Sequence, residues 1–261
     1  MVGEILVSKQ GAVGTITISN PTKMNAMSVQ MWTDLPKAIR DFDLDPEVRV
    51  IVIAGQGTKA FVSGADISQF DDLRSSADQQ QLYEDAVSAS MEAPVECRKP
   101  VIAKIRGYCF GGGLGLAAAC DIRICTTDAT FRMPAARLGL GYGAHGIKRF
   151  TDLIGLANAT DIFVTARRFD APDALRMGFV SRVVEGSDLD AVVDQYTTLI
   201  AENAPLTVAA SKYTIRQVCA HAEEQDLKGA EEMVLKCFAS EDFKEGRAAF
   251  LEKRPAQFKG R

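Results

Sequence analysis

Two glycine-containing segments carry residue types that can hold an anionic oxygen through backbone groups. Residues 61–67 (FVSGADI) follow an apolar run, and residues 108–115 (YCFGGGLG) lead directly into a run of small residues. Consecutive glycines let a ligand approach the backbone closely, and N–H groups at the start of a helix lack intrahelical partners. One N–H group from each segment would therefore suit a carbonyl oxygen that becomes an oxyanion during a reaction.

The glycine triplet admits other interpretations. Three glycines also permit tight packing of a helix on a sheet, so the triplet alone leaves both roles open. No GxxxxGK[ST] pattern of a phosphate-binding loop follows it, and it lacks the GxGxxG spacing of a dinucleotide-binding turn. A nucleotide phosphate is therefore not the indicated ligand.

The elements that must position these segments alternate between strand and helix. Ser28 is placed to cap a helix that runs to about Asp43, and Pro36 inside this helix predicts a kink. Apolar and β-branched runs predict strands over residues 12–19, 48–54, 101–105 and 122–125. A small-residue helix is expected over residues 111–119. This alternation predicts an α/β fold with parallel strands.

After about Asp188 the pattern becomes helical. Helices are predicted over residues 189–203, 206–220, 223–238 and 243–253. We therefore expect an α/β core over residues 1–187 and a helical region over residues 188–261.

The composition limits the classes of partner. A net charge of −4 and scattered basic residues argue against nucleic acid. The longest apolar stretch, residues 114–120, is too short to cross a membrane, and the first residues do not resemble a signal peptide. Six cysteines without a CxxC spacing indicate free thiols in a reducing compartment, which predicts a cytoplasmic protein. Two histidines, His145 and His221, are too few for a histidine-rich metal centre.

Motifs along nearly the whole chain resemble the enoyl-CoA hydratase/isomerase, or crotonase, superfamily. They are Asn25-Ala26-Met27, residues 61–67, residues 107–116 (GYCFGGGLGL), Cys120-Asp121-Ile122, Phe131, Leu138-Gly139 and residues 249–254 (AFLEKR). The resemblance implies a spiral of ββα units, followed by a helical region that assembles the chain as a homotrimer or a dimer of trimers.

The resemblance also implies that the chain binds an acyl-CoA thioester, with no metal and no cofactor beyond the coenzyme A of the substrate. The thioester oxygen would be held by the N–H groups of Ala65 and Gly112. Contacts with coenzyme A are implied for Lys23, Met24, Ala26, Ser63, Gly64, Ala65, Asp66, Ile67, Phe250 and Lys253. The last two often reach the coenzyme A of a neighbouring subunit. Without the resemblance, Lys253 would be interpreted as a solvated helix residue.

Two positions depart from the family pattern of a hydratase. The familiar members carry one glutamate two residues after the glycine triplet and another after the proline of a PExxLG segment. Here Gly115 and Ala135 stand in these places. General acid–base groups commonly contribute about 10²–10⁴-fold to a rate, so their loss favours reactions that reach an enolate without a carboxylate base. We therefore expect a lyase, with decarboxylation of a malonyl-type thioester as one possible reaction.

Tyr142 and His145 are the remaining candidates for proton chemistry. Tyr142 makes the segment similar to methylmalonyl-CoA decarboxylase within the superfamily. That enzyme, however, has a histidine where Ala65 stands and a glutamate where Gly115 stands. Tyr142 is equally compatible with aromatic packing, and His145 with a surface or helix-capping role.

Three functional hypotheses follow. The first is the lyase. The second is an enoyl-CoA hydratase or isomerase whose acid or base is Tyr142, His145, Asp71 or Asp72. The third is a protein that binds acyl-CoA thioesters with little catalysis.

Overall fold

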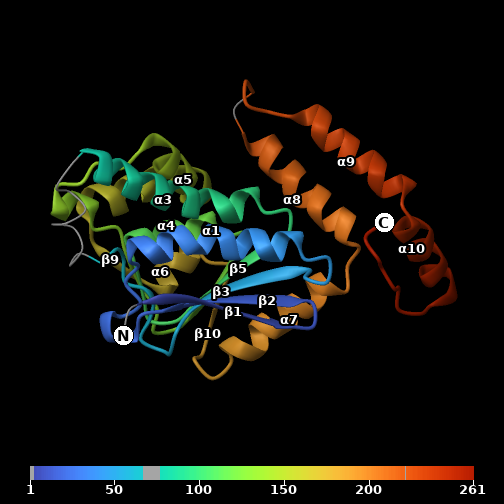
Figure 1. Ribbon diagram of the computed structural model, residues 1–261, viewed down its shortest axis with the longest axis horizontal. Coiled ribbons are helices and arrows are strands. Elements are labelled where there is room, and N and C mark those ends of the chain that lie inside the picture. The colour runs from blue at the N-terminus through green and yellow to red at the C-terminus, as the bar shows by residue number, and fades with distance from the viewer. Residues whose placement is uncertain (1–2, 67–76, 221) are drawn as a thin grey trace.

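The computed structural model describes residues 3–66, 77–220 and 222–261 (Figure 1). Its strands are β1 (Glu4–Gln10), β2 (Val13–Ser19), β3 (Val50–Gly55), β4 (Ala60–Val62), β5 (Val101–Ile105), β6 (Tyr108–Phe110), β7 (Ile122–Thr126), β8 (Thr130–Arg132), β9 (Arg168–Asp170) and β10 (Arg182–Val184). Its α-helices are α1 (Val29–Leu44), α3 (Ala77–Glu96), α4 (Gly112–Ala119), α5 (Ala144–Thr165), α6 (Ala171–Arg176), α7 (Leu189–Ala201), α8 (Pro205–Cys219), α9 (Leu227–Ala239) and α10 (Glu241–Glu252). Two short 3-10 helices, η1 (Pro21–Lys23) and η3 (Ala135–Leu138), complete the described elements.

The strands form two sheets through a repeated unit. One sheet has the order β1-β2-β3-β5-β7-β10 and the other β4-β6-β8-β9. Successive pairs of strands, β3 and β4, β5 and β6, then β7 and β8, each place their first strand in the larger sheet and their second in the smaller one. The helices α3, α4 and α5 follow these pairs in turn. The predicted α/β spiral of ββα units is therefore confirmed.

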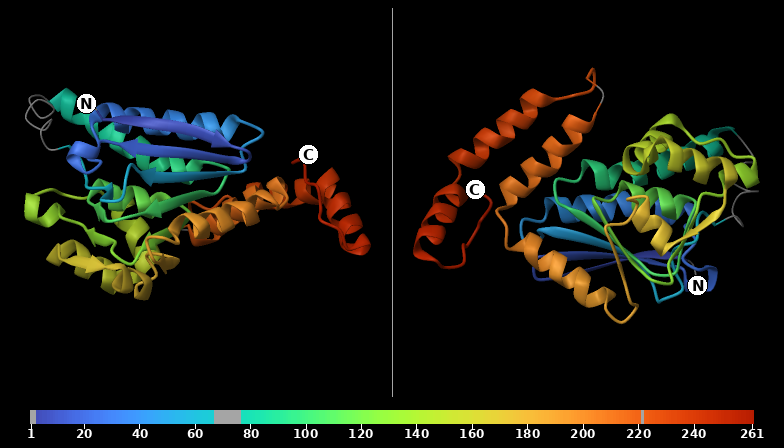
Figure 2. Two further views of the ribbon diagram at one scale, coloured as in Figure 1. Left: turned by 90° about the horizontal axis from the view of Figure 1, so that it is seen from below. Right: turned by 180° about the vertical axis from the view of Figure 1, so that it is seen from behind.

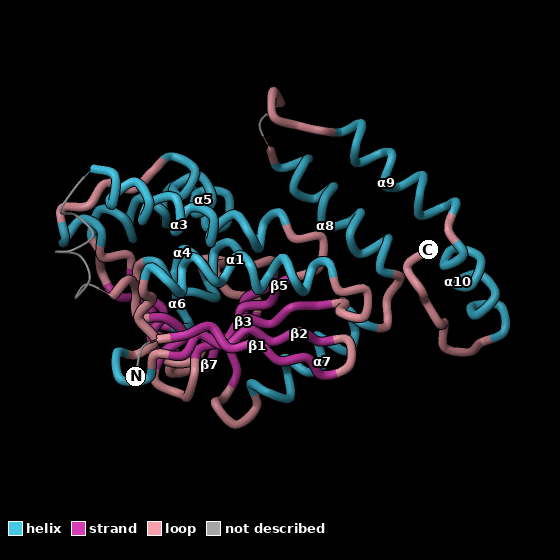
Figure 3. Tube along the Cα trace, in the orientation of Figure 1, coloured by secondary structure: helices cyan, strands magenta, loops and turns pink. Residues whose placement is uncertain are grey.

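Alternate residues of the central strands pack on opposite faces of the larger sheet. Ile51 and Ile53 of β3 belong to the main hydrophobic core, whereas Val50 and Val52 pack with Leu189 and other residues of α7. Because both faces are covered, the strand is continuously apolar, as the sequence predicts. Figure 3 shows this sheet lying between its covering helices.

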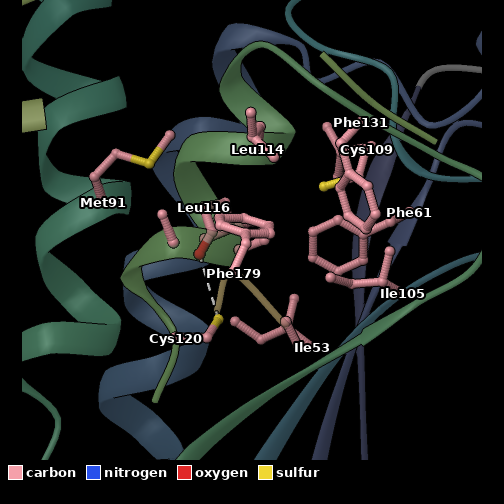
Figure 4. Packing of buried hydrophobic residues seen from close by; sticks show 14 of the residues in the cluster. Ile53, Phe61, Met91, Ile105, Cys109, Leu114, Leu116, Cys120, Phe131 and Phe179 are labelled. Atoms are coloured by element: carbon pink, nitrogen blue, oxygen red, sulfur yellow. Dashed lines mark hydrogen bonds between the residues drawn. The ribbon is translucent and has the colours of Figure 1, made fainter. Parts of the chain in front are cut away.

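Helix α4 lies inside the main core. All its residues except Gly112 are buried, and Figure 4 shows Leu114 and Leu116 in the same cluster as Phe61 and Phe131. At its end the Cys120 thiol donates a hydrogen bond to the Leu116 carbonyl at 3.3 Å. A helix buried on every side must be apolar all round, which explains its composition.

Helices α8, α9 and α10 extend away from the sheets as an arm (Figures 1 and 2). Asp121, the residue before β7, forms ion pairs with Lys212 and Arg216 of α8, both at 2.7 Å, and so ties this helix to the core. Within the described part of the chain, no helix is long and apolar enough to span a bilayer. All six cysteines are free, and four of them are buried, whereas Cys219 is exposed and Cys237 is half-buried.

Candidate active site

The N–H group of Ala65 takes no part in the hydrogen bonds between its segment and the neighbouring residue Met27. Met27 and Ala65 form a parallel bridge, in which the Met27 N–H binds the Gly64 carbonyl at 2.9 Å and the Asp66 N–H binds the Met27 carbonyl at 2.8 Å. The bridge therefore uses the Gly64 carbonyl and the Asp66 N–H, and not the N–H of Ala65 itself. Within residues 3–66, 77–220 and 222–261, the Ala65 N–H has no hydrogen-bond acceptor.

Gly112 is the first residue of α4, so its N–H has no intrahelical acceptor. No other described residue accepts a hydrogen bond from it. Close packing also requires these glycines. A Cβ atom on Gly112 would lie 2.9 Å from Cζ2 of Trp32, and one on Gly113 would lie 2.4 Å from the Val62 carbonyl oxygen. The triplet therefore serves tight packing and also leaves a backbone donor free.

The loops that carry Ala65 and Gly112 approach each other closely. A Cβ atom on Gly111, whose φ is +51°, would lie 3.9 Å from the Cα atom of Gly64. Ala65 and Gly112 both line one cavity of about 580 Å³. The structure thus brings together the two residues that the sequence selects as oxyanion donors.

Tyr142 occupies the space beside Gly115 in this cavity. A Cβ atom on Gly115 would lie 2.9 Å from the Tyr142 hydroxyl oxygen and 3.3 Å from Cε of Met91. The Tyr142 ring packs edge-on against Phe163, with 5.1 Å between centroids. The hydroxyl thus lies where a side chain at position 115 would begin.

The Tyr142 hydroxyl is a neutral donor near pH 7. Burial raises the pKa of this phenol above its ordinary value of 10.0, and the positive charge of Arg149 opposes that rise in pKa. No described residue forms a hydrogen bond with the hydroxyl. It is therefore available to donate a proton or a hydrogen bond to a ligand, whereas it is a poor base.

Helix α3 contributes to the cavity lining two carboxylates that no sequence motif indicates. Ala135, at the second glutamate position, is buried at the start of η3 and lines the cavity. Among the described residues, the carboxylates that line the cavity are Glu84 and Glu92, both on α3. Glu92 accepts a hydrogen bond from Arg149 at 2.9 Å. The sequence signal for them is helical spacing, since positions 84, 88, 91 and 92 share one face.

The other candidates for proton chemistry differ in position. His145 lines the cavity but is exposed. Asp71 and Asp72 lie outside the described residues, as does Ile67 among the predicted coenzyme A contacts.

Most of the predicted coenzyme A contacts gather beside Ala65. The Lys23 ammonium group lies 2.7 Å from the buried Asp66 carboxylate. The Ser63 hydroxyl donates to the Lys23 carbonyl at 3.2 Å, and the Ser63 N–H donates to the Met24 carbonyl at 3.2 Å. Ala26 is buried, whereas Met24 is 45% exposed. Ser63, Gly64 and Ala65 line the cavity itself.

Phe250 and Lys253 lie apart from this cavity. Phe250, on α10, is 83% exposed and borders a separate groove between α8, α9 and α10. Lys253 is the C-cap of the same helix. Figure 1 shows α10 at the far end of the arm from α3 and α5. Within one chain, these two residues are therefore not brought to the other predicted contacts.

Comparison with known proteins gives matches over nearly the whole chain. The family model described as enoyl-CoA hydratase/isomerase matches residues 8–261. A short-chain-enoyl-CoA hydratase of Clostridium acetobutylicum is 33% identical over 259 residues, which cover 98% of each chain. A crotonyl-CoA hydratase of Syntrophomonas wolfei is 32% identical over 255 residues and 97% of each chain. The crystal structure of an enoyl-CoA hydratase/carnithine racemase from Magnetospirillum magneticum matches with a TM-score of 0.94 at 32% identity, over 100% of this chain and 97% of that one.

Proposed function

Because the chain belongs to the enoyl-CoA hydratase/isomerase family, we propose that it converts an acyl-CoA thioester through an enolate held by Ala65 and Gly112. Ala65 and Gly112 line one cavity, and their N–H groups have no acceptor among the described residues. Preorganised backbone donors of this kind stabilise negative charge on a thioester oxygen as it develops.

The reaction that we propose is hydration or isomerisation of an enoyl-CoA, with Tyr142 as the proton donor to the α-carbon. The carrying observation is the Tyr142 hydroxyl beside Gly115, 2.9 Å from the place of a Cβ atom. It puts a neutral O–H group where the family resemblance expects a carboxylic acid. The names of the relatives from Clostridium acetobutylicum and Syntrophomonas wolfei support hydration over the lyase expected from the sequence.

Decarboxylation of a malonyl-type thioester is the second candidate. Burial raises the pKa of Tyr142, so near pH 7 the side chain is a neutral phenol that can protonate an enolate but has no phenolate oxygen with which to accept a proton. Loss of CO₂ would supply the enolate electrons without any base. Because Gly115 and Ala135 supply no carboxylate, a reaction that needs no base remains the second candidate.

Coenzyme A binding is assigned here to the surface around Ala65. Among the described residues, Lys23, Met24, Ala26 and residues 63–66 form the proposed contacts within one chain. Phe250 and Lys253 would contribute to the coenzyme A site of a neighbouring subunit in a trimer, since neither lines the cavity of its own chain and α10, which carries them, lies at the far end of the arm (Figure 1).

One set of product assays tests these alternatives. The wild-type protein is incubated separately with crotonyl-CoA, malonyl-CoA and methylmalonyl-CoA, and the products are identified by mass spectrometry. We expect 3-hydroxybutyryl-CoA from crotonyl-CoA and no CO₂ from the other two. Release of CO₂ without hydration would select the second candidate. Tight binding without any turnover would overturn both and select a binding protein.

A further inference from the structure

Helix α3 presents one continuous face to the cavity. The lining residues include Tyr83, Glu84, Val87, Ser88, Met91 and Glu92. Their spacing of three and four places them along one side of a helix. The proposed reaction needs a base to activate water, and this face supplies the only described carboxylates in the cavity.

The two carboxylates on this face differ in their surroundings. Glu84 is exposed and accepts a hydrogen bond from Gln80, one turn earlier on the same helix, at 2.8 Å. The Glu92 side chain is 42% exposed and is paired with Arg149 of α5, whose side chain is only 18% exposed. Glu92 is therefore held across the cavity by a second element, whereas Glu84 is held only by its own helix.

Glu92 also belongs to the turn of α3 that packs beside the proposed proton donor. The preceding residue, Met91, reaches within 3.3 Å of the Cβ position of Gly115, where the Tyr142 hydroxyl lies at 2.9 Å. Arg149 binds Glu92 directly, and its charge also acts on Tyr142. The Arg149 guanidinium group thus binds the carboxylate and acts on the tyrosine through its charge.

We propose that Glu92 is the general base that activates water for addition to the enoyl-CoA, and that Arg149 positions its carboxylate. This inference rests on the hydration proposed above. It names a carboxylate on α3 in place of those absent at Gly115 and Ala135.

The step conserves atoms and charge. The Glu92 carboxylate takes a proton from water while the water oxygen bonds to the β-carbon. The electrons of the C=C bond move to the thioester oxygen, where Ala65 and Gly112 hold the enolate. Tyr142 then gives its proton to the α-carbon as the C=C bond of the enolate closes back to the carbonyl. The proton on Glu92 passes to the tyrosinate through water in the cavity, so the net change is addition of one water molecule.

The test compares Glu92→Gln with Glu84→Gln, a matched change two turns earlier on the same face. Glutamine has an amide oxygen that can accept the hydrogen bond from Arg149. The variant therefore loses the negative charge and the basicity of Glu92 but keeps this hydrogen bond. We expect kcat for crotonyl-CoA hydration to fall about 10²–10⁴-fold in Glu92→Gln. Glu84→Gln is expected to retain wild-type kcat, with KM and melting temperature unchanged in both variants.

The pH profile separates a base from a structural role. Tyr83 and Glu84 of α3, His145 and Arg149 of α5, and Tyr142 are the other ionisable groups lining the cavity. We expect the fall of kcat at low pH to persist in Glu84→Gln and in Arg149→Lys, and to vanish in Glu92→Gln. Arg149→Lys is expected to lose less activity than Glu92→Gln, because it retains the base.

Two results would overturn the role of Glu92 and leave the proposed function standing. One is a Glu92→Gln protein that hydrates crotonyl-CoA at the wild-type rate. The other is an equal loss of kcat in Glu92→Gln and Arg149→Lys, with the fall of kcat at low pH intact in both. That pattern is expected of an ion pair that only joins α3 to α5. A wild-type protein that does not hydrate crotonyl-CoA would instead overturn the proposed function itself.

Discussion

The absent side chain of Gly115 and the position of Tyr142 depend on each other. The hydroxyl oxygen of Tyr142 lies so close to Gly115 that a Cβ atom there would be 2.9 Å away. A glutamate at position 115 would therefore have to displace the tyrosine, so the two acids are alternatives in this cavity. Gly115→Glu alone would therefore not restore the glutamate arrangement of a hydratase, because Tyr142 already occupies that space.

Gly115→Ala should consequently lower activity by moving Tyr142. A misplacement of about 1 Å at a reacting group can cost about 10²-fold in rate, and we expect a loss of that order in kcat for crotonyl-CoA hydration. Gly141→Ala is the control, because a Cβ atom on Gly141 meets nothing within 4 Å. Equal activity of the two variants would show that the contact with Tyr142 does not matter.

Ala65→Pro removes one of the two proposed oxyanion donors. The bridge uses the N–H groups of Met27 and Asp66, which remain. Loss of one oxyanion donor typically costs about 10²–10³ in kcat, and we expect that range, with the melting temperature and coenzyme A affinity near those of the wild type. Full turnover in a folded Ala65→Pro protein would exclude the role.

The sequence predicts the backbone donors better than it predicts the acid–base groups. Ala65 and Gly112 lie in motifs whose spacing is distinctive, and the structure places both in one cavity. Glu92 has no motif around it, and its position depends on the long-range contact between α3 and α5 through Arg149. Sequence spacing predicts which residues share a helix face but does not predict what that face meets.

At the scale of elements, the close packing of α4 against β4 depends on a glycine. A Cβ atom on Gly113 of α4 would lie 2.4 Å from the Val62 carbonyl oxygen, which belongs to β4. Gly113→Ala should therefore force α4 and β4 apart and lower the free energy of unfolding by about 1–3 kcal/mol. Chemical denaturation measures the change, with Gly141→Ala again as the control. A Gly113→Ala protein as stable as the control would contradict this packing.

Helices and strands were predictable where a local signal was strong. The buried strands β3 and β5 and the helix capped by Ser28 appear as predicted, and the Ser28 hydroxyl accepts a hydrogen bond from the Met31 N–H at 3.2 Å. Helix α9 starts at Leu227, four residues later than expected, because the Asp226 side chain caps it by accepting the Gly229 N–H at 2.9 Å. Helices α3 and α5 and strand β1 were not predicted. Gly155 interrupts the helical backbone of α5, and β1 is an edge strand with mostly exposed residues.

At the scale of the whole molecule, the arm exposes an apolar surface. Leu235 and Phe238 of α9 are 62% and 60% exposed, and Phe250 and Leu251 of α10 are 83% and 77% exposed. Clustered apolar exposure of this kind is typical of a surface that a partner covers. The proposed partner is another copy of the chain, in line with the trimer that the family resemblance implies.

Light scattering should therefore give a mass of three or six copies of the 28.2 kDa chain. Phe238→Asp should lower that mass, because a charge would be buried in the subunit interface. Leu156→Asp, the same kind of change at an exposed apolar residue of α5 outside the arm, should leave the mass unchanged. A stable monomer of the wild-type protein at micromolar concentration would contradict the assembly and the shared coenzyme A site.

The most direct measurement is the rate of crotonyl-CoA hydration by Tyr142→Phe. This change removes one hydroxyl and keeps the ring that packs against Phe163. We predict that kcat falls about 10²–10⁴-fold, because the α-carbon loses its proton donor. Affinity for butyryl-CoA, an unreactive analogue, should stay near that of the wild type. A Tyr142→Phe protein with kcat within about twofold of the wild type would contradict proton donation by this tyrosine.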